Sequence, residues 1–216
     1  WADRDLTRAV NLAHVFQISG AEYTFTGRTP GGAYYYILWL FLLISSDAYI
    51  IYIVYLVFLF AAIVYVADWV GQAFSGRVAV FFIIALLGNY TVLANLGMLW
   101  NPMIGFPFML VSLLFTWRMV AERNGLFIIP AAALAAVAIQ CHLSFVYLLP
   151  IAIVSSLTTR IDYRWIGYGL GILCVVAAFS PYLVYEVQHD FPIYKEAVFN
   201  KAVQQVSIIA TPINLP

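Results

Sequence analysis

The sequence predicts an all-α protein, a polytopic bundle of helices in a membrane. Hydrophobic residues make up 64% of the 216 residues and charged residues only 9%, whereas soluble domains are about half apolar and about a quarter charged. The mean hydropathy is +0.93, and several apolar runs approach the roughly 20 residues that a helix needs to cross a bilayer. These observations exclude a soluble domain. A formal net charge of zero gives no indication of a nucleic-acid partner.

The opening stretch, residues 1–20, concentrates charge ahead of the first apolar run. It carries Asp3, Arg4, Asp5 and Arg8, and the apolar residues that follow Asp5 recur at helical spacing. This pattern predicts a short amphipathic helix that lies in the plane of the membrane interface. Asp5 lies near the start of that helix, where a carboxylate caps free N–H groups and meets the positive end of the helix dipole. Capping is therefore the alternative to a catalytic role for Asp5.

The tyrosine-rich run at residues 33–45 is too short to cross a bilayer. It holds thirteen residues, whereas a crossing helix needs about 17 to 25. We expect it to skim the bilayer as a second interfacial or re-entrant helix. Crossings are predicted where the apolar runs are longer, at residues 48–70, 78–94, 103–119 and 165–185.

Residues 126–157 allow two interpretations. As one helix they would be about 48 Å long, too long for a hydrocarbon core of about 30 Å. Gln140 and His142 lie in a polar junction near the middle, which favours two short helices that meet there, around a site that dips below the membrane surface. The alternative is one steeply tilted helix bent at Pro150, with His142 inside the bilayer. A further break is expected at 95–102, because Pro102 disfavours helical angles at the residue before it.

Arginines are dense in three short loops, which predicts that these loops face the cytoplasm. They are Arg77, Arg118, Arg123, Arg160 and Arg164. In this predicted topology, the polar residues that lie within apolar stretches all fall on the opposite, extracytoplasmic face. They are Asp3, Asp5, Asn95, Asn101, Gln140, His142 and Glu186.

Three parts are therefore predicted along the chain. Residues 1–47 form an extracytoplasmic loop with two juxtamembrane helices, and residues 48–185 form the transmembrane bundle. Residues 186–216 form an extracytoplasmic tail or the start of a further loop.

A succession of motifs accompanies this topology: the acidic opening helix, TPGGAYYYIL, an outer loop with WNP, the junction QCHLS, and SPYLVYEVQHDFP. In this order they resemble the amino-terminal portion of the polyprenyl-phosphate-sugar-dependent membrane glycosyltransferases of the GT-C fold. That family includes the protein O-mannosyltransferases and the bacterial aminoarabinose transferase-like enzymes. The resemblance covers nearly the whole chain and implies a bacterial plasma membrane, with the site on the extracytoplasmic face. It also implies that the chain is part of a longer protein.

The resemblance implies transfer of a sugar from a polyprenyl-phosphate carrier to an acceptor. A carboxylate of the first outer loop, here Asp5 or Asp3, would take the proton of the attacking acceptor. Negative charge at that place would also stabilise an oxocarbenium-like centre. The leaving phosphate favours cationic partners. The candidates are Arg4, Arg8, Arg28 and His142.

Other residues are assigned to substrate binding with an alternative for each. Asn101 stands where several relatives carry an aspartate, and an amide can hydrogen-bond but cannot act as a base. Tyr34 or Trp100 is a candidate for stacking on the sugar, or else both belong to an interfacial aromatic belt. Glu186, with His189 and Asp190, is a candidate for a divalent metal, or else forms a solvated helix cap. No other cofactor is indicated besides the lipid-linked sugar.

A second function class remains open, that of a non-catalytic, transferase-like subunit of a larger membrane complex. Asn101 in place of the acidic residue favours it. The expected partners are accordingly the lipid bilayer, a lipid-linked sugar and other membrane subunits. A transporter or channel is disfavoured because few charged residues lie deep in the predicted spans.

Overall fold

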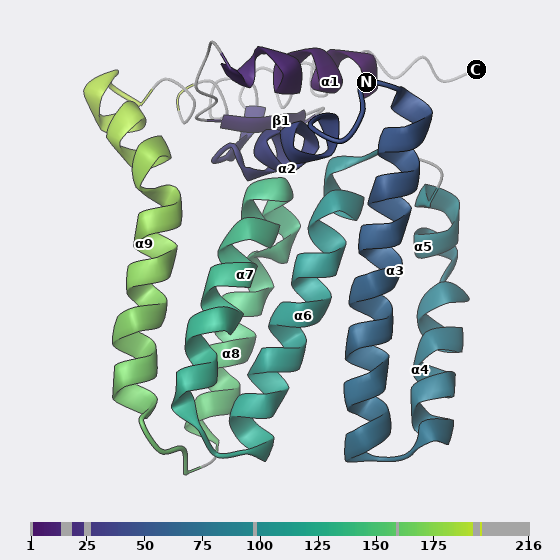
Figure 1. The fold of residues 1–216 in the computed structure, drawn as a ribbon. Coiled ribbons are helices and arrows are strands. Elements are labelled where there is room, and N and C mark those ends of the chain that lie inside the picture. The colour runs from purple at the N-terminus through teal and green to yellow at the C-terminus, as the bar shows by residue number, and fades with distance from the viewer. Residues whose placement is uncertain are drawn as a thin grey trace, which may run out of the picture.

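A computed structural model shows a bundle of helices with two short helices lying across one end of it (Figure 1). The structure describes residues 2–13, 19–23, 27–96, 99–158, 160–191 and 195, and of these the side chains of 2–4, 13, 19–23, 27–30 and 91 are not described. Three helices are long and apolar enough to cross a membrane: α3 (Ala48–Ala73), α6 (Asn101–Ala121) and α9 (Arg164–Gln188). The chain is therefore a helical membrane protein.

Three of the predicted crossings are confirmed as helices of spanning length, with small shifts at their ends. Asp47 caps α3 by accepting the backbone N–H groups of Tyr49 and Ile50, at 2.7 and 3.3 Å. Helix α6 begins at Asn101, two residues earlier than predicted. A helix tolerates proline in its first turn, where the missing N–H would have no partner in the helix, so Pro102 does not delay the start.

The crossing predicted at 78–94 is wrong as a single helix. The structure has α4 (Gly76–Leu87) and then α5 (Tyr90–Asn95). Gly88 ends α4, and the side chain of Asn89 accepts the N–H of Val92 at 3.4 Å to begin α5. Asparagine competes with helical bonding and favours such caps, so the apolar run is interrupted there.

Residues 126–157 divide at His142 into two helices, so the alternative of one tilted helix is wrong. Helix α7 (Ile128–Cys141) follows the short 3₁₀ turn η2 (Gly125–Phe127), and α8 (Leu148–Leu157) follows η3 (Leu143–Tyr147). His142 has extended backbone angles, φ −153° and ψ 122°, which end α7. The chain turns back here, and α7 and α8 pack against each other.

The segment before α3 forms the layer across the bundle end. It contains α1 (Ala2–Val10), η1 (Asn11–Ala13), an antiparallel pair of strands and α2 (Ala33–Leu42). The strands, β1 (Ser19–Tyr23) and β2 (Gly27–Pro30), pair Glu22 with Arg28. This small sheet was not predicted and is a departure from an all-α chain. Helix α2, with ten residues, is about 15 Å long and lies across the bundle rather than along it (Figure 1).

Small residues let the central helices approach closely, as is common between membrane helices. The alanine-rich helix α7 packs against both α6 and α9. Ser112 of α6 donates to the carbonyl of Ala131 at 2.8 Å. On the other side Gly167 of α9 lies against Gly125, where an added Cβ would come within 2.0 Å of the Gly125 carbonyl oxygen. Only glycine fits at this crossing.

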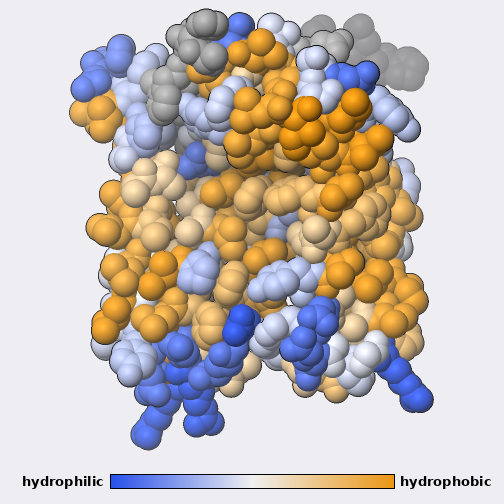
Figure 2. Space-filling view, viewed as in Figure 1, coloured by the Kyte–Doolittle hydropathy of each residue, from blue (hydrophilic) through white to orange (hydrophobic). Residues whose placement is uncertain are grey.

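The two ends of the bundle are polar and its middle is apolar. Figure 2 shows an orange band between blue groups at both ends. Three connections, between α3 and α4, between α6 and η2, and between α8 and α9, carry arginines or are flanked by them in the adjoining helix turn, and they lie at the end away from α1 and α2 (Figure 1).

Replacing Gly167 by alanine should lower the free energy of unfolding by about 1–3 kcal/mol, because the new methyl group must displace a backbone carbonyl. Gly169→Ala is the matched control on the same helix, since an added Cβ there meets nothing within 4 Å. Thermal unfolding in detergent measures both variants. Equal midpoints for the two variants would contradict the close α9–η2 contact.

Candidate functional site

The side chain of Asp5, on α1, is held by two tyrosines of α2. The Tyr34 hydroxyl lies 3.2 Å from Asp5 Oδ2 and the Tyr35 hydroxyl lies 3.4 Å from Oδ1. Asp5 is only 6% exposed, and both tyrosines are buried. Burying a carboxylate is costly unless it is hydrogen-bonded, and the two hydroxyls meet that requirement across the α1–α2 contact. The carboxylate is thereby fixed in orientation at one end of the bundle.

Arg8 extends this cluster from the next turn of α1. Its Nη1 donates to the hydroxyl oxygen of Tyr35 at 3.1 Å. The same hydroxyl donates to Asp5, so a guanidinium, a hydroxyl and a carboxylate follow one another in a chain. The positive charge of Arg8 polarises the Tyr35 O–H bond and strengthens its donation to the carboxylate.

Tyr34 has two acceptors within reach. Its hydroxyl lies 3.2 Å from Asp5 Oδ2 and 3.3 Å from the carbonyl oxygen of Leu99. A hydroxyl has one proton to donate, so Tyr34 holds either the carboxylate or the start of the α6 segment. Burial, and next the negative charge of Asp5, raise the pKa of Tyr34 well above its usual value of 10. The hydroxyl therefore stays protonated and remains a donor.

Gln140 joins three helices beside this cluster. Its Oε1 accepts the backbone N–H of Ala33 at 3.2 Å, at the start of α2, and its Nε2 donates to the carbonyl of Ala178 in α9 at 2.8 Å. Gly31 lies against it with φ +92°, and a Cβ at that position would be 2.4 Å from the Gln140 side chain. Sequence reasoning placed Gln140 among the polar residues of this face but gave it no role. Its position at the end of an apolar helix was the available signal.

Asn101 and His142 lie at the same end of the bundle. The Asn101 side chain is buried and donates to the carbonyl of Cys141 at 3.0 Å, so it ties the start of α6 to the end of α7. The His142 ring packs beside Trp100, with ring centroids 6.4 Å apart. Burial lowers the pKa of His142 below its usual 6.5. The imidazole is neutral at pH 7, which leaves Arg8 as the described cation of this cluster.

Of the remaining predicted site residues, the structure describes the side chain of Glu186. The side chains of Asp3, Arg4 and Arg28 lie outside the described residues. Glu186 is buried near the carboxy-terminal end of α9, at the end of the bundle where α1 and α2 also lie (Figure 1).

A metal centre finds no support in the described part of the chain, where no three metal-binding side chains come together. His189 stacks on Tyr185 and its Nδ1 lies 2.9 Å from the Tyr185 carbonyl oxygen. Asp190 forms an ion pair with Lys195. Both side chains are therefore engaged locally, just past the end of α9.

No protein-family model, no curated protein and no solved structure matches the chain. The fold and the site define a class by themselves: a helical membrane protein with a buried, tyrosine-held carboxylate at one end of its bundle.

Replacing Gln140 by leucine should lower the free energy of unfolding by about 1–3 kcal/mol, because it removes the hydrogen-bond partners of the half-buried N–H of Ala33 and the half-buried carbonyl of Ala178. Gln72→Leu is the control, since Gln72 is exposed and donates to Asp68 of its own helix. Thermal unfolding in detergent compares them. A Gln140→Leu variant as stable as Gln72→Leu would show that the bridge does not hold α2.

The lowered pKa of His142 predicts a pH dependence of stability. In the unfolded chain the imidazole takes up a proton near pH 6.5, and in the folded protein only at lower pH. The free energy of unfolding should therefore fall as the pH drops through 6.5. His142→Gln should reduce the loss of melting temperature between pH 7 and pH 5, whereas His189→Gln, at an exposed position, should not.

Proposed function

We propose that the chain transfers a sugar from a polyprenyl-phosphate carrier to an acceptor, and that Asp5 accepts the proton of the acceptor. The site is the end of the bundle where α1 and α2 lie, and we assign this end to the extracytoplasmic face. The observation that carries the proposal is the burial of Asp5 between two hydroxyl donors. Buried ionisable groups in membrane proteins mark functional sites more often than structural ones.

The chemistry requires one base and one stabilised leaving group. The acceptor oxygen or nitrogen forms a bond to the anomeric carbon while the bond between that carbon and the phosphate oxygen breaks. The acceptor proton passes to the Asp5 carboxylate, and the electron pair of the broken bond leaves with the lipid phosphate. A positioned carboxylate contributes typically about 10²–10⁴-fold to such a step.

The neighbours of Asp5 suit this role. The Tyr34 and Tyr35 hydroxyls lie within hydrogen-bond distance of the two carboxylate oxygens, and donors at these oxygens hold the carboxylate in a fixed orientation for proton transfer. Arg8 supplies positive charge one hydroxyl away, and a guanidinium is a strong partner for a phosphate oxygen.

Aromatic surface for a sugar is better supplied by Trp100 than by Tyr34. The Tyr34 ring is 1% exposed, whereas Trp100 is 45% exposed at the start of α6. The predicted stacking role of Tyr34 therefore gives way to holding Asp5, and Trp100 is an exposed ring at this end, next to the start of α6.

Asp5→Asn should reduce transfer at least 100-fold, because an amide keeps the shape but cannot accept the proton. The assay uses membranes that contain the whole protein, supplied with a polyprenyl phosphate bearing a radiolabelled hexose. Asp68→Asn, an exposed carboxylate on α3 near the opposite end, is the control and should leave transfer unchanged. Undiminished transfer by Asp5→Asn at equal protein levels would overturn the assignment of the base.

A second candidate function is a non-catalytic subunit of a larger membrane complex. The observation that favours it is the uncovered apolar surface of two helices. No side chain of α4 is fully buried, and only 11% of the apolar stretch of α9 is buried inside the protein. This function predicts co-purification with other membrane proteins in fixed stoichiometry. It also predicts that Asp5→Asn weakens the α1–α2 contact while neither variant nor wild type transfers sugar.

A further inference from the structure

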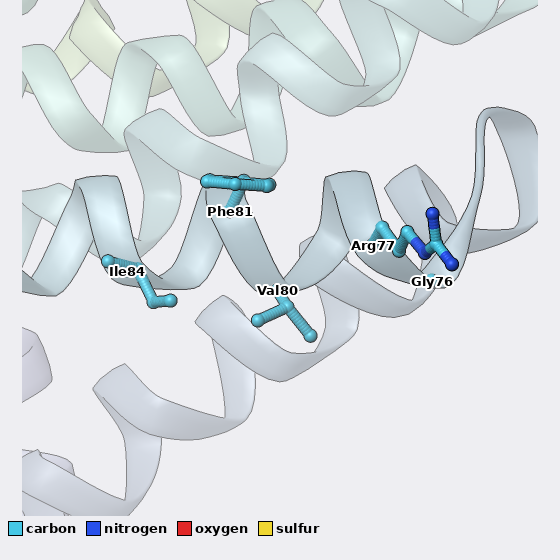
Figure 3. A pocket seen from close by; sticks show the side chains of 5 residues that line it. All are labelled: Gly76, Arg77, Val80, Phe81 and Ile84. Atoms are coloured by element: carbon cyan, nitrogen blue, oxygen red, sulfur yellow. The ribbon is translucent and has the colours of Figure 1, made fainter.

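Within the described part of the chain, a hollow on the outer face of α4 is lined by five residues of that helix. They are Gly76, Arg77, Val80, Phe81 and Ile84 (Figure 3). Its volume is about 300 Å³. The residues recur three and four positions apart, so they follow one face of the helix. Arg77 is the single polar side chain among them, which makes the lining apolar along its length and cationic at one end.

The cationic end and the apolar end of the hollow lie at different levels of the bundle. Arg77 lies in the first turn of α4, at the end where the arginine-bearing connections gather (Figure 1). Ile84 lies seven residues further on, about 10 Å along the helix axis toward the middle of the bundle. An occupant must therefore carry a polar group at the bundle end and an apolar part toward the bundle centre.

The charge at the mouth of the hollow is uncompensated. Arg77 is exposed, and no hydrogen bond or ion pair joins it to the part of the chain that the structure describes. The start of α4 adds the positive end of the helix dipole beside it. A phosphate is the group that complements both.

The neighbouring hollow offers a contrast. It lies between α3 and α4, is larger at about 430 Å³, and shares Gly76 with the first. Its wall carries Asp68, whose carboxylate accepts a hydrogen bond from Gln72 at 2.7 Å. The negative charge of Asp68 disfavours a phosphate in this second hollow. The two hollows therefore differ in the charge of the group that they favour.

We propose that the Arg77 hollow binds an anionic phospholipid of the surrounding leaflet. The phosphate lies on the guanidinium of Arg77, and one acyl chain follows Val80, Phe81 and Ile84. Val80, Phe81 and Ile84 are 55%, 72% and 60% exposed, so this face of α4 meets the bilayer directly, and a bilayer lipid is the amphiphile that reaches it with the required polarity. The inference does not depend on sugar transfer, which is assigned to the opposite end.

The test is native mass spectrometry of the whole chain in a neutral detergent. Equal amounts of phosphatidylglycerol and phosphatidylcholine with the same acyl chains are added, and the bound ratio is measured. Arg77→Gln should lower the preference for phosphatidylglycerol about fivefold, the effect of one basic residue near an anionic surface. Arg160→Gln removes the same charge from another connection at the same end and should change the ratio little.

The apolar part of the hollow is tested separately. Val80→Trp and Ile84→Trp fill it while keeping Arg77, and each should also lower the preference for phosphatidylglycerol. Val57→Trp is the control, since Val57 is an exposed apolar residue of α3 outside the hollow. Equal effects of Arg77→Gln and Arg160→Gln, or an unchanged ratio in both tryptophan variants of the hollow, would overturn the proposal.

Discussion

Helix α2 depends on hydrogen bonds that it can make only at the end of the bundle. It is too short to cross a bilayer, and its first turn carries a free N–H at Ala33 and the hydroxyls of Tyr34 and Tyr35. Gln140 accepts the N–H and Asp5 accepts the hydroxyls. Each such group would cost about 1–3 kcal/mol if it were buried without a partner. These bonds bring α1, α7 and α9 to one place and build the candidate site.

The central helix α7 makes this arrangement possible. Its alanines let α6 and α9 approach, and its end at Cys141 brings Gln140 and His142 under the layer of α1 and α2. Because α7 and α8 are short, the chain turns back at that level. The carboxylate cluster and the exposed arginine of α4 consequently lie at opposite ends of the bundle, so a reaction at one end and lipid binding at the other would not compete for space.

The site was predictable where a residue type is rare in its surroundings. A carboxylate before an apolar run is unusual, and Asp5 was assigned on that ground together with the family resemblance. Tyr35 and Gln140 were not assigned, because their partners lie 30 and 107 residues away in the chain. For Asn101 and His142 the sequence indicated polar residues at one membrane face. Whether they bond a substrate or the backbone depends on packing, which sequence spacing does not contain.

The sequence by itself determined that the chain is a helical membrane protein, where its long apolar helices run, and that residues 126–157 break at the polar junction. Hydropathy and length decide these features, because lipid cannot satisfy backbone groups and a span must match the bilayer. The tertiary structure alone decided that 78–94 divides at Gly88 and Asn89, that a strand pair precedes α2, and that Asp5 is held by two tyrosines. These features depend on contacts between residues that are far apart in the sequence. A local sequence pattern predicts that a helix forms, but it does not predict which other elements pack against it.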